Sequence, residues 1–143
     1  MELPYASVDL YLPRRAHDVA EILVGRGIRD TKPFERQIDF WWAGLCVGVA
    51  LDLQAETERD AVKFNQGAIL QSDATRIIQL ELLALAKRGP NALDSPREVL
   101  EFASRYANGG CLRLAGKLAS STEPIVGLFN ELAACGILES ERD

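Results

Sequence analysis

The residues that could do chemistry in this chain are few and scattered. His17 is the only histidine, and its place beside Asp18 on a predicted amphipathic helix favours a surface or packing role over general-base catalysis. Cys46, Cys111 and Cys135 stand far apart in apolar sequence, which is typical of reduced packing cysteines. This set lacks the ligand spacing of a metal site. We therefore predict no catalytic residue, no metal and no cofactor, and interpret the protein as not an enzyme.

The block "RYANGG" at 105–110 interrupts a pattern that otherwise predicts helices. Asn108 and Gly109 tolerate the positive φ that a helix C-terminus favours, and Gly110 would let the next helix start close by. The block therefore predicts the end of a helix. Tyr106 is predicted to anchor that helix in the core, with its hydroxyl reaching a polar partner at the edge.

Composition limits the classes of function. The chain has 143 residues, of which 48 % are hydrophobic and 26 % charged, with a formal net charge of -5. These values predict one folded domain, 1–143, and weigh against non-specific binding to a phosphate backbone. The sequence shows no signal peptide and no apolar run long enough to span a bilayer. We therefore expect a cytoplasmic protein that does not bind a membrane.

Hydrophobic periodicity predicts a mainly α fold, with a short N-terminal strand followed by five to six helices. The predicted divisions are a strand-helix-helix start over 1–53, an exposed loop over 54–71 with a short extended piece near 62–64, and C-terminal helices over 72–137. The second helix, 32–53, is predicted to be the most buried. Its adjacent Trp41 and Trp42 point about 100° apart, so one is expected in the core and the other at its edge.

Helix starts are predicted from capping residues. Ser95 is the clearest, since Pro96 and Glu98 follow at the first and third helical positions. Ser72 and Thr122 are the predicted caps of the helices on either side of it. With the break at 108–110, a further helix is expected over 111–119.

The N-terminal strand needs a pairing partner. Its ladder groups must bond either with the extended piece near Lys63 or with the same strand of another copy. In the second case Val8, Leu10 and Tyr11 are the candidate self-association residues, and the protein would be a homodimer or a larger oligomer.

The order strand, helix, helix resembles a ribbon-helix-helix unit, in which two copies pair their strands and read the DNA major groove. The outward Asp9 would repel phosphates in that role. Basic residues nearby are candidate contacts for DNA or for a partner protein, although acidic residues alternate with them. These candidates are Arg14, Arg15, Arg29, Lys32 and Arg36.

Three stretches carry a second resemblance: "FWWAGLCVGVAL", "LALAKRGPNAL" and "EFASRYANGG". Together they resemble the small phosphorothioation-associated proteins of bacterial DNA-sulfur-modification defence systems, the Dnd-associated group. The family block is Tyr106, Asn108, Gly109 and Gly110. The resemblance implies an accessory factor that acts beside a larger ATPase or nuclease, and it implies no catalytic residue.

Three hypotheses for the function follow. The leading one is a non-enzymatic accessory component of a phosphorothioation-linked restriction or antiphage system, acting through protein-protein contacts and DNA contacts. The alternative is a dimeric ribbon-helix-helix-like DNA-binding transcriptional regulator. The third is an enzyme whose site includes Tyr106, Asn108 and Arg113.

Overall fold

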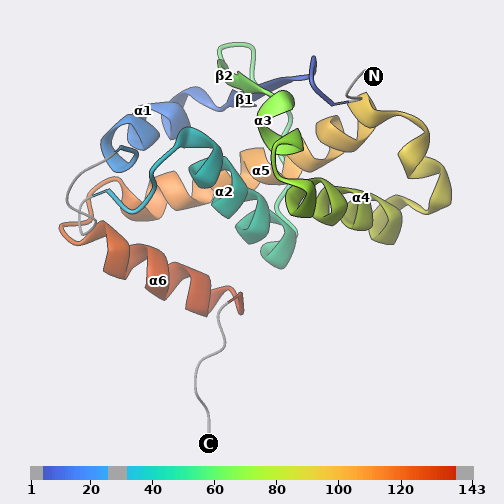
Figure 1. Ribbon diagram of the computed structural model, residues 1–143. Helices are drawn as coiled ribbons and strands as arrows, with labels where there is room; N and C mark the ends of the chain where they lie inside the picture. The colour runs from blue at the N-terminus through green and yellow to red at the C-terminus, as the bar shows by residue number, and fades with distance from the viewer. Residues whose placement is uncertain (1–4, 26–31, 138–143) are drawn as a thin grey trace, which may run out of the picture.

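The computed structural model describes residues 5–25 and 32–137, and these are mainly helical (Figure 1). The elements are β1 (Asp9–Leu12), α1 (Arg14–Leu23), α2 (Gln37–Leu51), β2 (Val62–Gln66), α3 (Ala68–Gln71), α4 (Ala74–Arg88), the 3-10 helix η1 (Pro90–Asp94), α5 (Pro96–Leu118) and α6 (Pro124–Ala134). The predicted fold class, a short N-terminal strand followed by helices, is confirmed.

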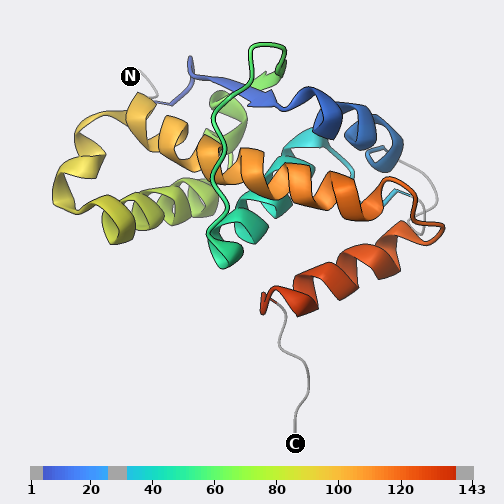
Figure 2. The ribbon, with the colours of Figure 1, turned by 180° about the vertical axis from the view of Figure 1, so that it is seen from behind.

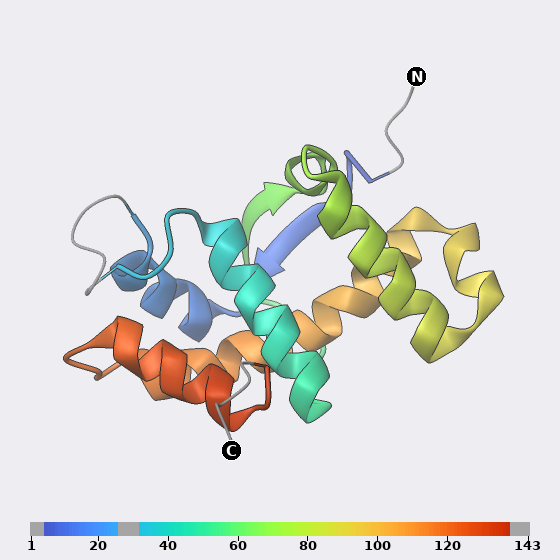
Figure 3. The ribbon, with the colours of Figure 1, turned by 60° about the horizontal axis from the view of Figure 1, so that its bottom comes forward.

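The long helix α5 organises the molecule. It contains 23 residues, and α2 crosses it, while the small sheet lies along one side. Figure 3 shows α2 lying between α4 and α6. In the view from behind, the connection from α2 to β2 crosses the opposite side of α5 (Figure 2). Helix α5 is therefore covered on several sides by segments that are far apart in the sequence.

β1 and β2 form a two-stranded antiparallel sheet within one chain. Asp9 pairs with Gln66 and Leu12 with Val62, and the register shifts between Leu10 and its neighbour Tyr11. Of the two partners that the sequence allowed for β1, the extended piece near Lys63 is the one observed. The segment 54–71, predicted as a loop, contains that strand and also the short helix α3, which was not predicted.

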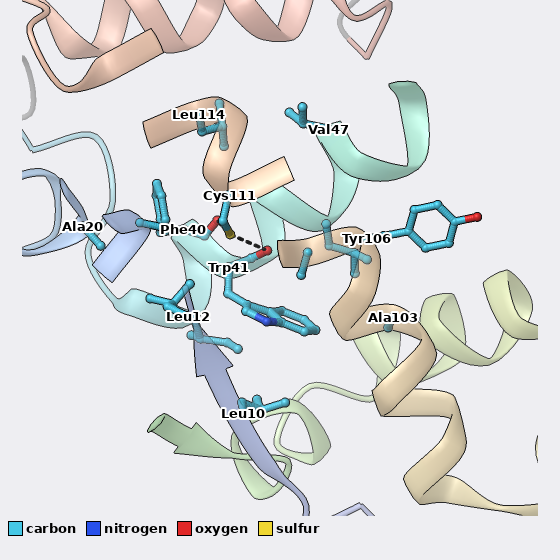
Figure 4. Packing of buried hydrophobic residues seen from close by; sticks show 14 of the residues in the cluster. Leu10, Leu12, Ala20, Phe40, Trp41, Val47, Ala103, Tyr106, Cys111 and Leu114 are labelled. Atoms are coloured by element: carbon cyan, nitrogen blue, oxygen red, sulfur yellow. Dashed lines mark hydrogen bonds between the residues drawn. The ribbon is translucent and has the colours of Figure 1, made fainter. Parts of the chain in front are cut away.

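The core gathers residues from nearly every element. Trp41 of α2 lies between Leu12 of β1 and Ala103 of α5 (Figure 4), and all of these residues belong to the core. Trp41 is 0 % exposed, whereas Trp42 is only partly buried at the core's edge. The prediction that one tryptophan lies in the core and the other at its edge is therefore confirmed.

One helix starts where it was predicted, and three others start one to five residues later. Ser95 caps α5 as predicted, its hydroxyl accepting a hydrogen bond from the backbone N–H of Glu98. Asp73 caps α4 instead of its neighbour Ser72, because the Asp73 carboxylate accepts from the backbone of the first turn. At α6 the residue before the helix is Glu123, and Thr122 makes no cap. The second helix, predicted from residue 32, begins at Gln37.

Candidate functional site

The "RYANGG" block lies inside α5, which continues unbroken from Pro96 to Leu118. The predicted helix end is therefore wrong, and the helix expected over 111–119 is the second half of α5. Among the described residues, positive φ values occur at Gly25, Asp52, Gly89 and Gly136, and not in this block. Backbone freedom consequently does not explain why glycines stand here.

The glycines mark the point where α2 and α5 touch backbone to backbone. A Cβ built on Gly110 would lie 2.6 Å from the carbonyl carbon of Gly44 and 2.7 Å from the nitrogen of Gly48. A Cβ on Gly44 would lie 2.8 Å from the backbone nitrogen of Cys111. The obstacles are backbone atoms of the opposing helix, which cannot turn aside as the end of a side chain could. We name this contact the α2–α5 crossing, and at it only glycine fits.

Gly109 and Tyr106 pack against the chain that leaves α2. A Cβ on Gly109 would lie 2.8 Å from the carbonyl carbon of Leu53. The Tyr106 hydroxyl donates to Asp52 Oδ1 and accepts from Gln54 Nε2, both at 3.4 Å. Burial, together with the nearby Asp52 carboxylate, raises the pKa of Tyr106. Tyr106 is thus the core anchor that was predicted, with its hydroxyl pointing away from the cluster (Figure 4).

Asn108 ties the same connection to α5. Its side chain is 2 % exposed, and its amide nitrogen donates to the Ala55 carbonyl at 3.0 Å and to Thr57 Oγ1 at 3.1 Å. The backbone N–H of Ala55 donates to the carbonyl of Arg105 at 3.0 Å. Because the amide of Asn108 is used in holding this connection, it is not offered to a ligand.

The residues of the enzyme hypothesis do not come together. Arg113 lies further along α5 than Tyr106 and Asn108. Its side chain pairs with Glu131 of α6, and its Nε lies 2.7 Å from Glu131 Oε1. This pair fastens α6 to α5. Over residues 5–25 and 32–137, no group of His, Cys, Asp and Glu has an arrangement that could hold a metal ion.

The N-terminal basic candidates lie on the first turn of α1. Arg14 and Arg15 are exposed. His17, one turn along, is partly buried, and its Nδ1 lies 3.8 Å from Glu21 Oε1. A packing and surface role for His17 agrees with this position.

The other basic candidates are engaged locally. Lys32 Nζ donates to the carbonyl of Ile22 at 3.1 Å. Arg36 precedes α2 and pairs with Asp39 at 3.4 Å. Arg29 lies outside the described residues. The described candidates therefore do not form one continuous basic face.

Two of the three self-association candidates are used inside the chain. Val8 and Leu10 are buried in the core, so they present no surface to another copy. Tyr11 is partly buried and lines a polar cleft of about 370 Å³. The residues that line this cleft come from β1 and the two residues before it, from α5, and from the connection after α2: Ser7, Val8, Asp9, Tyr11, Glu56, Thr57, Arg97, Glu101, Ser104 and Arg105.

Charged side chains of both signs line the polar cleft, and Lys63 of β2 pairs with one of them. Asp9 lies 3.1 Å from Lys63, and hydrogen bonds from Gln66 and Lys63 hold the pKa of Asp9 below its ordinary value. Arg97 lies 3.8 Å from Glu101. The cleft therefore carries acidic and basic side chains together.

An apolar groove lies between α2 and α4, and we name it the α2–α4 groove. Its volume is about 370 Å³. The side chains that line it are Trp42, Leu45, Cys46, Val49, Ala50, Gln79, Leu80, Leu83 and Ile137. Beyond it on α4, Ile78 and Leu82 are 55 % and 57 % exposed. These two residues are one helical turn apart, so they form an apolar ridge on α4, the helix that also lines one side of the groove.

Arg76 of α4 makes polar contacts beside Trp42, at one end of the α2–α4 groove. The Arg76 guanidinium lies 5.1 Å from the centre of the Trp42 ring, and it pairs with Asp39 at 3.1 Å and with Asp73 at 3.8 Å. Burial raises the pKa of Cys46, although Arg76 opposes this effect. A thiol with a raised pKa is a poor nucleophile, so Cys46 contributes apolar surface to the groove.

Sequence reasoning missed this groove. The available signal was the apolar content of α4, in which Ile78 and Leu82 fall outside the buried positions Leu80 and Ala84. A second signal was α2, which is apolar nearly all round.

Comparison with known proteins finds no matching family, no similar curated protein and no similar solved structure. Within the described part of the chain, every helix is too short or too polar to cross a bilayer.

Proposed function

We propose that this protein is a non-enzymatic accessory component that binds a partner protein through the α2–α4 groove. The observation that carries the proposal is the combination of an apolar groove with the exposed Ile78 and Leu82 on the same helix. Large exposed apolar side chains that gather beside a groove are typical of protein interaction sites.

A protein suits this surface better than a small molecule. A ligand of the groove's volume would fill the space above Trp42 and Leu83 but would leave Ile78 and Leu82 in water. The apolar side of an amphipathic helix could cover both, because its residues at i, i+3, i+4 and i+7 extend along a groove. The partner that we propose therefore contributes an amphipathic helix.

The resemblance to the phosphorothioation-associated proteins supplies the biological setting of the proposal. In that setting the partner is a larger ATPase or nuclease of a DNA-modification defence system in the cytoplasm. Arg14 and Arg15 are exposed and remain the candidate DNA contacts of the assembled complex.

The ribbon-helix-helix regulator is less well supported. Its DNA-reading ribbon requires β1 to pair with β1 of another copy, whereas β1 pairs with β2 of the same chain. A mobility-shift assay with the purified protein on its own promoter region would bring the regulator back if a specific duplex were retarded.

The test of the proposal uses Leu82→Glu, which places a charge on the ridge beside the groove. The matched control is Ile22→Glu on α1, where the side chain is 63 % exposed and away from the groove. Tagged wild-type, L82E and I22E proteins are purified from the cells that make the native protein, and co-purifying proteins are quantified by mass spectrometry. We expect a partner that wild type and I22E retain and that L82E loses by at least tenfold.

Two results would count against the proposal. If L82E retains every partner of the wild type, the groove is not the binding surface. If the lost partner has no link to DNA modification or restriction, the docking role stands and the defence-system setting is wrong.

A further inference from the structure

The α2–α4 groove has a third wall, which comes from a distant part of the sequence. All of its lining residues but one belong to α2 and α4, and the exception is Ile137. Ile137 lies just beyond α6, and Figure 3 shows this end of α6 beside α2. We infer that Ile137 limits the size of the apolar side chain that a partner helix inserts into the groove. The inference rests on the docking function proposed above and adds a residue that decides its specificity.

The backbone at the end of α6 sets the position of Ile137. Gly136 has a φ of 78°, and its N–H donates to the carbonyl of Ala133 at 3.1 Å. The N–H of Ile137 donates to the carbonyl of Leu132 at 3.0 Å. These two hydrogen bonds form a Schellman motif, which turns the chain back at the end of a helix. Ile137 is therefore directed toward the core, against which it is partly buried.

An ion pair holds α6, and with it this wall, on α5. The carboxylate of Glu131 is 7 % exposed, and its Oε1 accepts a hydrogen bond from Arg113 Nε at 2.7 Å. The thiol of Cys135 donates to the same oxygen at 3.7 Å. Neither Arg113 nor Glu131 lines the groove. They are positioning residues, because they fix the helix whose end carries Ile137.

The place of Ile137 explains how it would act on a partner. A docked amphipathic helix presents its apolar side chains at i, i+3, i+4 and i+7 along a groove. The partner's side chain nearest to Ile137 must share the groove's volume of about 370 Å³ with it. A β-branched isoleucine has few rotamers with which to move aside. Its replacement by alanine should therefore admit a bulkier side chain.

Cys46 supplies a probe of this space that needs no partner. It lines the groove together with Ile137 and is partly buried. Cys111 is 0 % exposed. The third cysteine, Cys135, is replaced by serine in all samples, which leaves a donor for Glu131. The rate at which a thiol reagent modifies Cys46 then reports which sizes of molecule can enter the groove.

The experiment compares two maleimides of different size, N-ethylmaleimide and N-(1-pyrenyl)maleimide, with the modified protein quantified by mass spectrometry. Ile137→Ala should raise the rate of the pyrenyl reagent at least tenfold and that of the ethyl reagent much less. Glu131→Gln should change the ratio of the two rates in the same direction, because the uncharged amide holds Arg113 less strongly. The control is Ala134→Ser on the exposed side of α6, which should leave both rates unchanged.

Two results with these reagents would overturn the inference. Either I137A leaves the ratio of the rates as it is in the wild type, or it raises both rates equally. An equal rise is what a general loosening of the fold produces, and thermal unfolding identifies that case. A ratio that changes in I137A but not in E131Q would leave Ile137 as the wall and remove the role of the ion pair.

A second measurement separates this inference from the docking proposal. Ile137→Trp fills the groove, so in the co-purification described above it should lose the partner at least tenfold, as L82E does, whereas A134S should keep it. If L82E loses the partner and I137W retains it, docking stands and the inference about Ile137 is wrong. If L82E retains every partner, the docking proposal fails and this inference fails with it.

Discussion

The α2–α5 crossing and helix α6 differ in how their apolar residues are used. Those at the crossing are packed between two helices, whereas some of those on α6 are exposed to solvent. At the crossing, Gly44 and Gly110 bring two backbones together and leave no space for even a methyl group. On α6, Phe129 is 61 % exposed among the described residues. In the first region two backbones meet directly, whereas the second exposes a large apolar side chain. The partner that we propose is therefore to be sought at the α2–α4 groove, and the unusual "RYANGG" block belongs to folding.

The largest effect is expected from Gly110→Ala. The new Cβ would clash with the backbone of Gly44 and Gly48, so the two helices must separate and lose packing along their length. Overpacking typically costs about 1–3 kcal/mol and occasionally more, and we expect the upper end here because the obstacle is backbone. Urea unfolding followed by circular dichroism measures the loss of stability.

The control for this substitution is Gly116→Ala in the same helix. Gly116 is exposed, and the nearest atom to a Cβ there, Arg15 Nη2, is 4.0 Å away. Replacing glycine by alanine at such a helical position should stabilise the protein by about 0.5–1 kcal/mol. If G110A were as stable as G116A, the helices would not be in backbone contact, and the comparison would fail.

A smaller effect is expected from Asn108→Ala, which removes the two hydrogen bonds to Ala55 and Thr57. The Ala55 carbonyl would lose a donor at a half-buried site, which costs about 1–2 kcal/mol. Hydrogen exchange at the backbone N–H of Ala55 should become faster, since this connection would no longer be tied to α5. Asn130→Ala on the exposed side of α6 is the control and should leave stability unchanged. Equal stability of N108A and wild type would contradict the role given to Asn108.

Several features could be predicted because local sequence determines them. The alternation of Leu10 and Leu12 indicated β1, and Ser95 with Pro96 and Glu98 indicated the start of α5. The angle between neighbouring helical residues separated Trp41 from its neighbour. In each case the residues that decide the structure lie within one turn or one strand of each other.

Other features depend on contacts that local sequence does not contain. Asn-Gly-Gly has the same local preference at a helix end as at a helix crossing, and each glycine costs about 1 kcal/mol within a helix. Only the opposing Gly44 and Gly48 explain why α5 continues through it. The α2–α4 groove was missed for a similar reason. Which apolar side chains of α4 stay uncovered is decided by where α2 lies, and not by the periodicity of α4.

The smallest effect on stability is expected at large apolar side chains that are exposed, such as Leu82 beside the α2–α4 groove. Leu82→Ser and Phe129→Ser replace side chains that are more than half exposed, so folding should change by no more than about 0.5 kcal/mol. The same method, urea unfolding, places these variants on one scale with G110A, and measurement at low protein concentration removes any contribution from self-association. A loss above about 1 kcal/mol for either variant would mean that the residue already packs within the chain. If urea unfolding also finds L82E close to the wild type in stability, its loss of the partner separates binding from folding in this molecule.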